Sequence, residues 1–264
     1  MIVAVVGLER EARIVAGPDI SISRRGANLP AFIAQGARGI ISIGIAAGLD
    51  PSLKVGDSVI ASCIIADNQR YEASEPWARS LCACLAASDP LPLVGRDRVG
   101  GQTMNVSGGL PPETPTRLPS HSVLRQGDLP TRGRWTSVRV GPVVGCGVVV
   151  ASVAEKEQLR TQTTALAVDM ESHIAAKAAA QANIPFVALR IISDQADEAL
   201  PPAAIVAMRA DGSIDMGAVI GSLLMKPTQI PALMRTARNA EIAFKALLRC
   251  RNALGPRLAF PDLG

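Results

Sequence analysis

Three acidic residues, Glu11, Glu171 and Asp194, follow short apolar runs that predict buried strands. In α/β folds, ligands bind outside the carboxyl ends of the strands, so these side chains are expected at one binding edge. A carboxylate is costly to bury, which favours a chemical role in which it accepts hydrogen bonds or transfers a proton. The competing interpretation of each is a solvated residue at a helix start. It weakens when all three are considered together.

The hydrophobic pattern indicates which elements would position these residues. Strands are expected at residues 1–6, 39–45, within 55–65 and 138–152, at 166–168 and at 185–192, and helices at 9–15, 29–37, 155–160, 170–182 and, as two or three, within 201–248. The small residues 46–48 are expected to form a tight turn. Apolar strands alternating with helices predict an α/β fold with a largely parallel sheet. The chain is expected to be one domain, residues 1–264, with an irregular Pro- and Gly-rich insertion at about 89–134.

Composition and charge narrow the class of protein. With 48% hydrophobic and 3% aromatic residues, the chain is expected to bury a large core made mainly of Ala, Val, Ile and Leu. Its net charge of +4 includes no basic block, so nucleic-acid binding is not expected. We find no pattern of a signal peptide or membrane span, and expect a soluble, cytoplasmic protein. The five cysteines have irregular spacings, so free thiols and no metal site are expected.

Two motifs carry a resemblance to a known family: residues 168–172 (VDMES) and 184–194 (IPFVALRIISD). Together they resemble the signature of the nucleoside phosphorylase superfamily, in particular of the methylthioadenosine/S-adenosylhomocysteine nucleosidases. Residues 44–49 (GIAAGL) and 53–57 (LKVGD) are similar to that family's loop on the ribose and anion side. The resemblance extends over residues 1–16, 39–66 and 145–197 but not over 89–134 or the C-terminal region. It implies a single-domain nucleoside-phosphorylase-like fold, with a central mixed twisted sheet flanked by helices.

A narrower resemblance rests on the wording VDMESH at 168–173, the lack of a hairpin after Glu11, and the chain length. These features are similar to the hopanoid-associated phosphorylases, which remove adenine from adenosylhopane. The resemblance implies a purine nucleoside with a hopane tail as substrate, phosphate as the one co-substrate to consider, and a homo-oligomer. Such a substrate would suit a basic protein that contacts the inner membrane peripherally.

The resemblance also implies roles for the acidic residues. Asp194 would protonate N7 of the leaving base, which requires a raised pKa. Glu171 would accept hydrogen bonds from the ribose hydroxyls, and Glu11 would orient or deprotonate the attacking water. Ser193 would orient the Asp194 carboxyl group. Arg190 would either support the loop that carries Asp194 or form a structural ion pair.

Further residues are expected to line the substrate. Gly44 and Ala46 belong to the loop on the ribose side, and Met170 would pack on the ribose or simply in the core. His173, two residues after Glu171 on a predicted helix, should point away from it.

The base side departs from the nucleosidase pattern, which stacks an aromatic ring on the purine. Val148 stands at that position, with backbone groups near Val149 available to read the purine edge. Trp77 or Tyr71 would be the alternative aromatic.

The phosphate side departs too. Phosphorylases of this superfamily place an arginine and a hydroxyl residue where this chain has Ser42 and Ile45. Arg24 and Arg25 could supply another anion site, or could form a solvated basic turn. Water and phosphate therefore both remain open as the nucleophile.

Three other functions compete with cleavage of a hopane-linked nucleoside. A methylthioadenosine-type nucleosidase would use the same residues. A non-catalytic nucleoside- or lipid-binding relative would not need both Glu171 and Asp194. A dinucleotide-binding oxidoreductase is excluded, because residues 7–12 read GLEREA instead of G-x-G-x-x-G.

Overall fold

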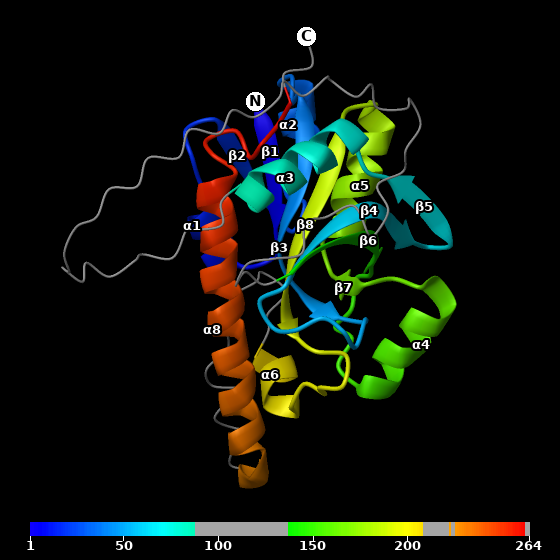
Figure 1. The fold of residues 1–264 in the computed structure, drawn as a ribbon, viewed down its shortest axis with the longest axis vertical. Helices are drawn as coiled ribbons and strands as arrows, with labels where there is room; N and C mark the ends of the chain where they lie inside the picture. Colours follow the sequence, from blue (N-terminus) through cyan, green and yellow to red (C-terminus); the bar gives the residue numbers. More distant parts are fainter. Residues whose placement is uncertain (88–136, 208–221, 223–224, 262–264) are drawn as a thin grey trace, which may run out of the picture.

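The computed structural model describes residues 1–87, 137–207, 222 and 225–261. It shows one α/β domain, in which a central mixed sheet is flanked by helices (Figure 1). This confirms the predicted fold class. The insertion expected at about 89–134 lies outside the described residues.

The sheet has eight strands: β1 (Ile2–Val6), β2 (Ile20–Arg24), β3 (Gly39–Gly48), β4 (Ser58–Ala66), β5 (Gln69–Glu72), β6 (Val138–Gly145), β7 (Ala167–Asp169) and β8 (Phe186–Asp194). The helices around it are α1 (Glu9–Val15), α2 (Leu29–Ala34), α3 (Glu75–Ala87), α4 (Val153–Thr163), α5 (Ser172–Ala182), α6 (Pro202–Ala207) and α8 (Ile230–Ala253), with a 3₁₀ turn η1 (Pro227–Gln229) before α8.

The strand order is β2-β1-β3-β7-β6-β4-β5, and β8 pairs with both β3 and β4. Strands β3, β8, β4, β6 and β7 therefore form a closed ring, from which β1 and β2 extend on one side and β5 on the other. Strands β1, β3 and β8 run parallel, so their carboxyl ends share one edge. That edge is where an α/β fold binds its ligands.

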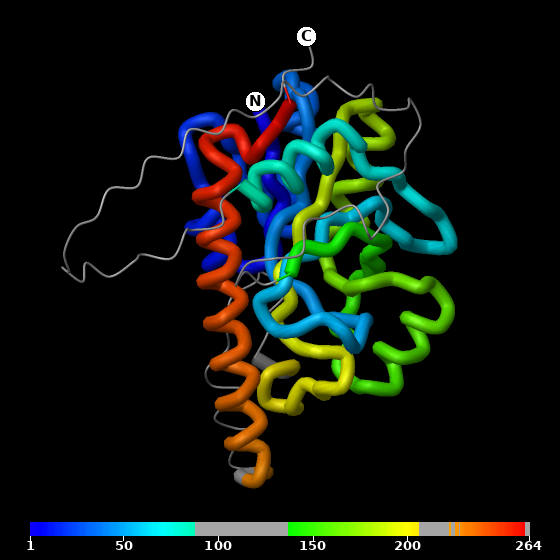
Figure 2. Tube along the Cα trace, in the orientation of Figure 1, coloured from blue at the N-terminus to red at the C-terminus, as the bar shows by residue number. Residues whose placement is uncertain are grey.

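Two apolar layers cover the strands. One contains α1, α3 and α8, which contribute Val15, Trp77 and Leu247 among other buried residues; α8 runs along this side of the molecule (Figures 1 and 2). The other contains α2 and α5, with Leu29 and a row of alanines. Because the buried face of α5 consists of Ala175, Ala176 and Ala179, the helix can pack closely on the sheet, which keeps its first residue at the binding edge.

The structure corrects several predicted boundaries. Residues 46–48 are not a turn but the last part of β3, since Ala46 and Ala47 pair with β8 and Ala47 with β7 as well. The first predicted helix, 9–15, is confirmed. The second, 29–37, ends at Ala34, and Gly36 follows with a positive φ of 86°. Strands β2 and β5 and helix α3 were not predicted.

Candidate functional site

Glu11 joins two strand ends at the binding edge. It lies in the first turn of α1 and is only 2% exposed. Its Oε2 accepts hydrogen bonds from the N–H groups of Gly7 and Leu8, both at 2.8 Å, and its Oε1 accepts one from Ile45 N–H at 2.7 Å. Burial raises the pKa of Glu11, although these backbone donors and Arg190 oppose the rise. Glu11 therefore caps the start of α1, but it is buried and not solvated.

Glu171 lies where β7 gives way to α5. Asp169 Oδ2 accepts hydrogen bonds from the N–H groups of Glu171, at 3.1 Å, and Ser172, at 2.9 Å, so Asp169 caps the helix and fixes the turn. Glu171 is buried, with 7% of the residue exposed. No hydrogen bond to its carboxylate occurs among the described residues. Burial raises the pKa of Glu171 to about 7, and the negative charge of Asp169 makes the second-largest contribution to that rise.

Both glutamates contact Gly7, which ends β1. Gly7 donates its N–H to Glu11, and a Cβ atom placed on Gly7 would lie 2.5 Å from Oε1 of Glu171. The absence of a side chain at Gly7 thus brings the two carboxyl groups to the same point. The resulting like-charge contact contributes to the raised pKa of Glu171.

Arg190 is fully buried beneath this pair. Its Nη2 donates to Ser172 Oγ at 2.9 Å and to Ser42 Oγ, and forms an ion pair with Asp169. Arg190 therefore supports the turn that carries Glu171 through a structural ion pair, the second of the two roles expected for it. Its Nη1 has no hydrogen-bond partner among the described residues. A Cβ atom on Gly44 would lie 2.9 Å from that nitrogen and would also collide with Glu11 Oε1, so only glycine fits at this position.

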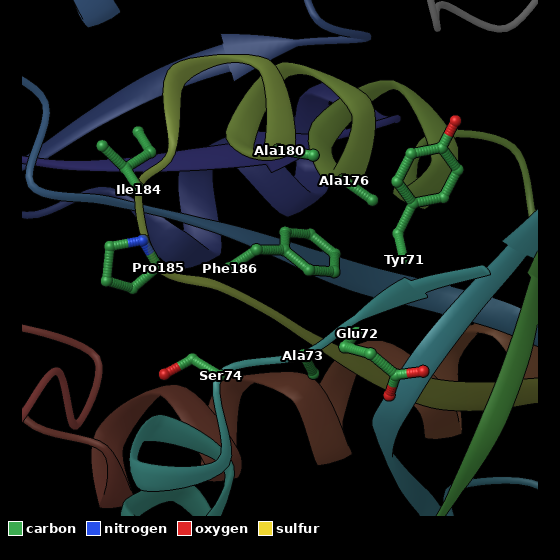
Figure 3. Close-up of a pocket in the computed structure, with 9 residues that line it drawn as sticks. All are labelled: Tyr71, Glu72, Ala73, Ser74, Ala176, Ala180, Ile184, Pro185 and Phe186. Atoms are coloured by element: carbon green, nitrogen blue, oxygen red, sulfur yellow. The ribbon is translucent and has the colours of Figure 1, made fainter. Parts of the chain in front are cut away.

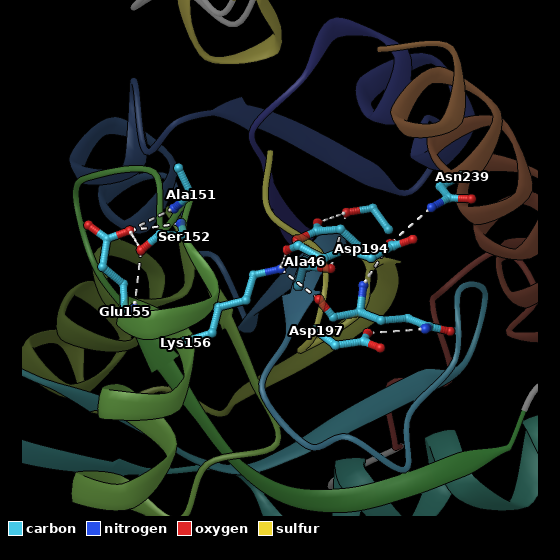
Figure 4. A network of polar contacts seen from close by, with 11 residues as sticks. Ala46, Ala151, Ser152, Glu155, Lys156, Asp194, Asp197 and Asn239 are labelled. Atoms are coloured by element: carbon cyan, nitrogen blue, oxygen red, sulfur yellow. Dashed lines mark hydrogen bonds and ion pairs between the residues drawn. The ribbon is translucent and has the colours of Figure 1, made fainter. Parts of the chain in front are cut away.

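Asp194 is the last residue of β8 and is 7% exposed. Ser193 Oγ donates to its Oδ1 at 2.8 Å, the contact that the sequence predicted between these residues. A residue that the sequence analysis missed, Lys156 of α4, places its Nζ 2.5 Å from Oδ2 (Figure 4). Burial raises the pKa of Asp194, and the Lys156 ammonium group opposes that rise.

Neither of the alternative aromatic residues, Trp77 and Tyr71, lies on the base side. Trp77 is fully buried against Phe260 and donates its Nε1–H to the Leu258 carbonyl at 2.9 Å. Tyr71 lines a hollow of about 200 Å³ with Phe186, the first residue of β8, whereas Asp194 is the last (Figure 3). That hollow lies at the opposite end of the strand, roughly 25 Å away at 3.3 Å per residue.

The loop after β6 carries the residues expected at the base. Val148 is 69% exposed, and its carbonyl accepts a hydrogen bond from Cys146 Sγ at 3.2 Å. Val149 of the same loop is half-buried. Outside this loop, Met170 after β7 is also half-buried, and the Ala46 carbonyl of β3 accepts a hydrogen bond from Ser193 Oγ at 3.2 Å. Val148 is thus an apolar side chain exposed on a loop, able to contact a flat base.

Arg24 ends β2 and Arg25 follows it, at the same edge as the carboxylates. Arg24 pairs in register with Val6, and Arg25 donates its N–H to the Val6 carbonyl at 2.8 Å with a positive φ of 49°. The charge of Arg25 lowers the pKa of Glu171, so Arg25 lies near that residue. His173 packs instead against Gly145, and burial lowers its pKa. It takes no part in the carboxylate pair.

Gly44→Ala is expected to lower activity sharply, because the new Cβ would collide with Glu11 and Arg190. A displacement of about 1 Å at reacting groups can reduce a rate by about 10²-fold. Gly141→Ala is the matched control, since its Cβ would collide with Leu166 in the core instead. We expect both to lower the melting temperature and Gly44→Ala alone to lower kcat of the folded protein. Equal kcat values for the two variants would contradict this placement of Glu11.

A sequence model of the phosphorylase superfamily matches residues 14–224, more than half of the chain. The chain belongs to the phosphorylase superfamily. Membership makes it a nucleoside-cleaving enzyme, and the expected resemblance to this superfamily is confirmed.

Solved structures share the fold of this phosphorylase-superfamily enzyme. The S-adenosylhomocysteine nucleosidase of Streptococcus pyogenes has 15% sequence identity and a TM-score of 0.52, with 93% of this chain and 95% of that one covered. The methylthioadenosine/S-adenosylhomocysteine nucleosidase of Neisseria meningitidis has 17% identity and a TM-score of 0.53, with 94% and 97% covered. Futalosine hydrolase of Helicobacter pylori has 14% identity and a TM-score of 0.54, with 95% and 97% covered. A comparison with curated proteins found no match.

Among the described residues, no three acidic, histidine or cysteine side chains are grouped so that they could hold a metal ion. The cysteines present there, Cys63, Cys82, Cys84, Cys146 and Cys250, are free thiols, as the sequence predicted.

Proposed function

We propose that this enzyme cleaves the N-glycosidic bond of an adenine nucleoside and releases the base. The observation that carries the proposal is the arrangement of three buried carboxyl groups at one sheet edge, with Glu11 and Glu171 against Gly7 and Asp194 at the end of β8. Burying a carboxylate opposes folding unless it is paired or hydrogen-bonded, so three of them gathered at one edge indicate a chemical role.

Asp194 is suited to protonate the base. Adenine anion is a poor leaving group, and a proton on N7 allows the glycosidic bond to break with its electron pair moving to the base. Burial raises the pKa of Asp194, which favours the protonated form that a general acid needs. Such catalysis contributes roughly 10²–10⁴-fold.

Glu171 is suited to hold the sugar. Its carboxylate is buried and has no donor among the described residues, and two ribose hydroxyl groups would supply the missing hydrogen bonds. Its negative charge would also stabilise the positive charge that develops on the ribose as the bond breaks. Met170, Gly44 and Ala46 lie on neighbouring segments of the same edge and would line the sugar.

Water held by Glu11 is our proposal for the nucleophile. Glu11 and Glu171 meet at Gly7, so a water molecule bound by the Glu11 carboxylate would stand close to the ribose that Glu171 is proposed to hold. Phosphate is the alternative, and the position of Arg25 near Glu171 favours it. At the expected arginine position, Ser42 instead accepts a hydrogen bond from Arg190.

For the substrate we propose adenosylhopane, with its apolar tail leaving the site at the ribose 5′ position. Three large apolar side chains around the start of α8 are exposed: Met225 by 84%, Ile230 by 43% and Met234 by 68%. Lys226 and Arg235 are exposed beside them. Figure 1 places the start of α8 near α6, at the end of the molecule toward which β8 runs. Peripheral membrane contact there, and a homo-oligomer, are parts of this proposal.

No helix of the described ranges has the length and apolar character to span a bilayer. A methylthioadenosine or S-adenosylhomocysteine nucleosidase is the second candidate, favoured by the shared fold, and it would use the same three carboxyl groups of this chain.

A substrate panel separates these candidates. Purified enzyme is incubated with adenosylhopane in detergent and with methylthioadenosine, and kcat/KM for adenine release is compared. We expect preference for the apolar substrate by at least about tenfold, since each buried methylene contributes about 0.8 kcal/mol. Preference for methylthioadenosine would overturn the hopanoid proposal while leaving base release intact.

A further inference from the structure

Lys156 is a fully buried cation beside the proposed acid. Its Nζ lies 2.5 Å from Asp194 Oδ2 and 2.7 Å from each of the backbone carbonyl oxygens of Gln195 and Glu198 (Figure 4). An ammonium group has three hydrogens, and these three acceptors use all of them. These three contacts match the three hydrogens of an ammonium ion, one of which is donated to Asp194.

The position of Lys156 is fixed from two sides. Ser152 and Glu155 form a capping box at the start of α4, and the Ala151 carbonyl accepts the N–H of Leu200, which ties the helix to the loop after β8. Glu198 Oε2 accepts hydrogen bonds from Gln195 N–H at 3.2 Å and from Asn239 of α8 at 3.1 Å. The loop whose carbonyls bind Lys156 is thus held between α4 and α8.

We propose that Lys156 is a positioning residue for the acid: its ammonium group fixes Oδ2 of Asp194, so that Oδ1 delivers the proton to the base. This inference rests on the proposed function. In the step, the proton leaves Oδ1 and binds N7, and the electron pair of the glycosidic bond moves to the base. The carboxylate that remains is stabilised by the Lys156 ammonium ion, which itself keeps all its protons.

Ser193 allows Asp194 to change protonation state. Its hydroxyl group lies within hydrogen-bond distance of two acceptors, Oδ1 of Asp194 at 2.8 Å and the Ala46 carbonyl at 3.2 Å, but it has one hydrogen. It can donate to Oδ1 while Asp194 is ionised, and to Ala46 while Oδ1 carries a proton. The neighbours of Asp194 therefore accommodate both states on Oδ1, while Oδ2 stays with Lys156.

Lys156 also affects the pH at which the acid is protonated. Among the described residues, the charged groups near Asp194 are Lys156 of α4 and Glu198 of the following loop, and α8 contributes the uncharged Asn239, which binds Glu198. Burial raises the pKa of Asp194, Lys156 lowers it, and Glu198 raises it. Removing the cation therefore raises that pKa further, and the acid stays protonated to higher pH.

The test compares kcat against pH for adenine release by wild type, Lys156→Met and Lys156→Gln. We expect the alkaline limb to move up by about one pH unit or more in both variants, because an adjacent cation shifts a carboxyl pKa by about 1–3 units. We also expect kcat at the optimum to fall about tenfold as Oδ2 loses its anchor, with KM within about twofold of wild type. Lys156→Gln keeps hydrogen-bond donors and provides a folded variant if Lys156→Met does not fold.

Lys177→Met is the matched control, because Lys177 pairs with Asp67 on the surface. It should reproduce the wild-type profile. Wild-type pH profiles in the folded Lys156 variants, with only a lower melting temperature, would overturn the inference and leave the proposed function standing. Absence of adenine release from wild type would overturn both.

Discussion

Replacing Asp194 with asparagine is expected to reduce base release by at least about 10²-fold, the lower limit of what general acid catalysis contributes. An amide has no acidic proton to give to N7, although its oxygen can still accept a hydrogen bond from Lys156. The native fold should persist, with a lower melting temperature because the buried ammonium ion loses its countercharge. The measurement is single-turnover adenine release together with circular dichroism.

The control for this variant lies three residues away. Asp197 is exposed and accepts only a 3.4 Å contact from the Gln195 side chain, so Asp197→Asn makes the same chemical change outside the acid. It should retain wild-type turnover. Unchanged turnover in folded Asp194→Asn would show that another group protonates the base.

Glu171→Gln is expected to lower kcat/KM by about 100-fold while stabilising the empty enzyme at neutral pH. A hydrogen bond to a charged group contributes about 1.5–3 kcal/mol, and Glu171 would lose its charge while facing two ribose hydroxyls. Adenine release over a range of nucleoside concentrations measures the loss. Glu157→Gln, on the exposed side of α4, is the control and should show no change.

The stability of this variant should depend on pH in a specific direction. Burial raises the pKa of Glu171 from 4.5 to about 7, so ionising it opposes folding. This destabilisation is absent below pH 4.5, grows between pH 4.5 and about 7, and is complete above about pH 7. It amounts to about 3 kcal/mol as an order of magnitude. Denaturant unfolding should therefore show Glu171→Gln gaining stability over wild type as pH rises from 5 to 8. Lower stability of the variant across this range would indicate a structural role for Glu171.

The sequence places the three acidic residues near strand ends because the determinants of these positions are local. Continuous apolar runs mark β1 and β8, and Glu11, Glu171 and Asp194 stand a few residues from strand ends, where chain geometry places them together. The small residues 46–48 were misread as a turn, because only their pairing with β7 and β8 makes them a strand.

The partners of the acidic residues could not be predicted, because they come from distant segments. Lys156 stands between two glutamates on a polar helix, a pattern typical of a solvated face, and only the packing of α4 against the loop after β8 buries it. Arg190 lies on the same strand as Asp194 but pairs with Asp169, which the fold brings beneath it. Trp77 and Tyr71 are the alternative aromatics for the base, yet the fold places one in the core and the other at the far end of β8.

The most direct test of the account is to incubate wild-type enzyme with a 5′-alkyl adenosine, with and without phosphate, and to identify both products. The account predicts free adenine together with the free 5′-alkyl ribose in the absence of phosphate. A sugar 1-phosphate formed only with phosphate would make the enzyme a phosphorylase and assign the anion to Arg24 and Arg25. No adenine from any adenine nucleoside, in detergent or with lipid, would contradict the central claim that these carboxyl groups cleave its N-glycosidic bond.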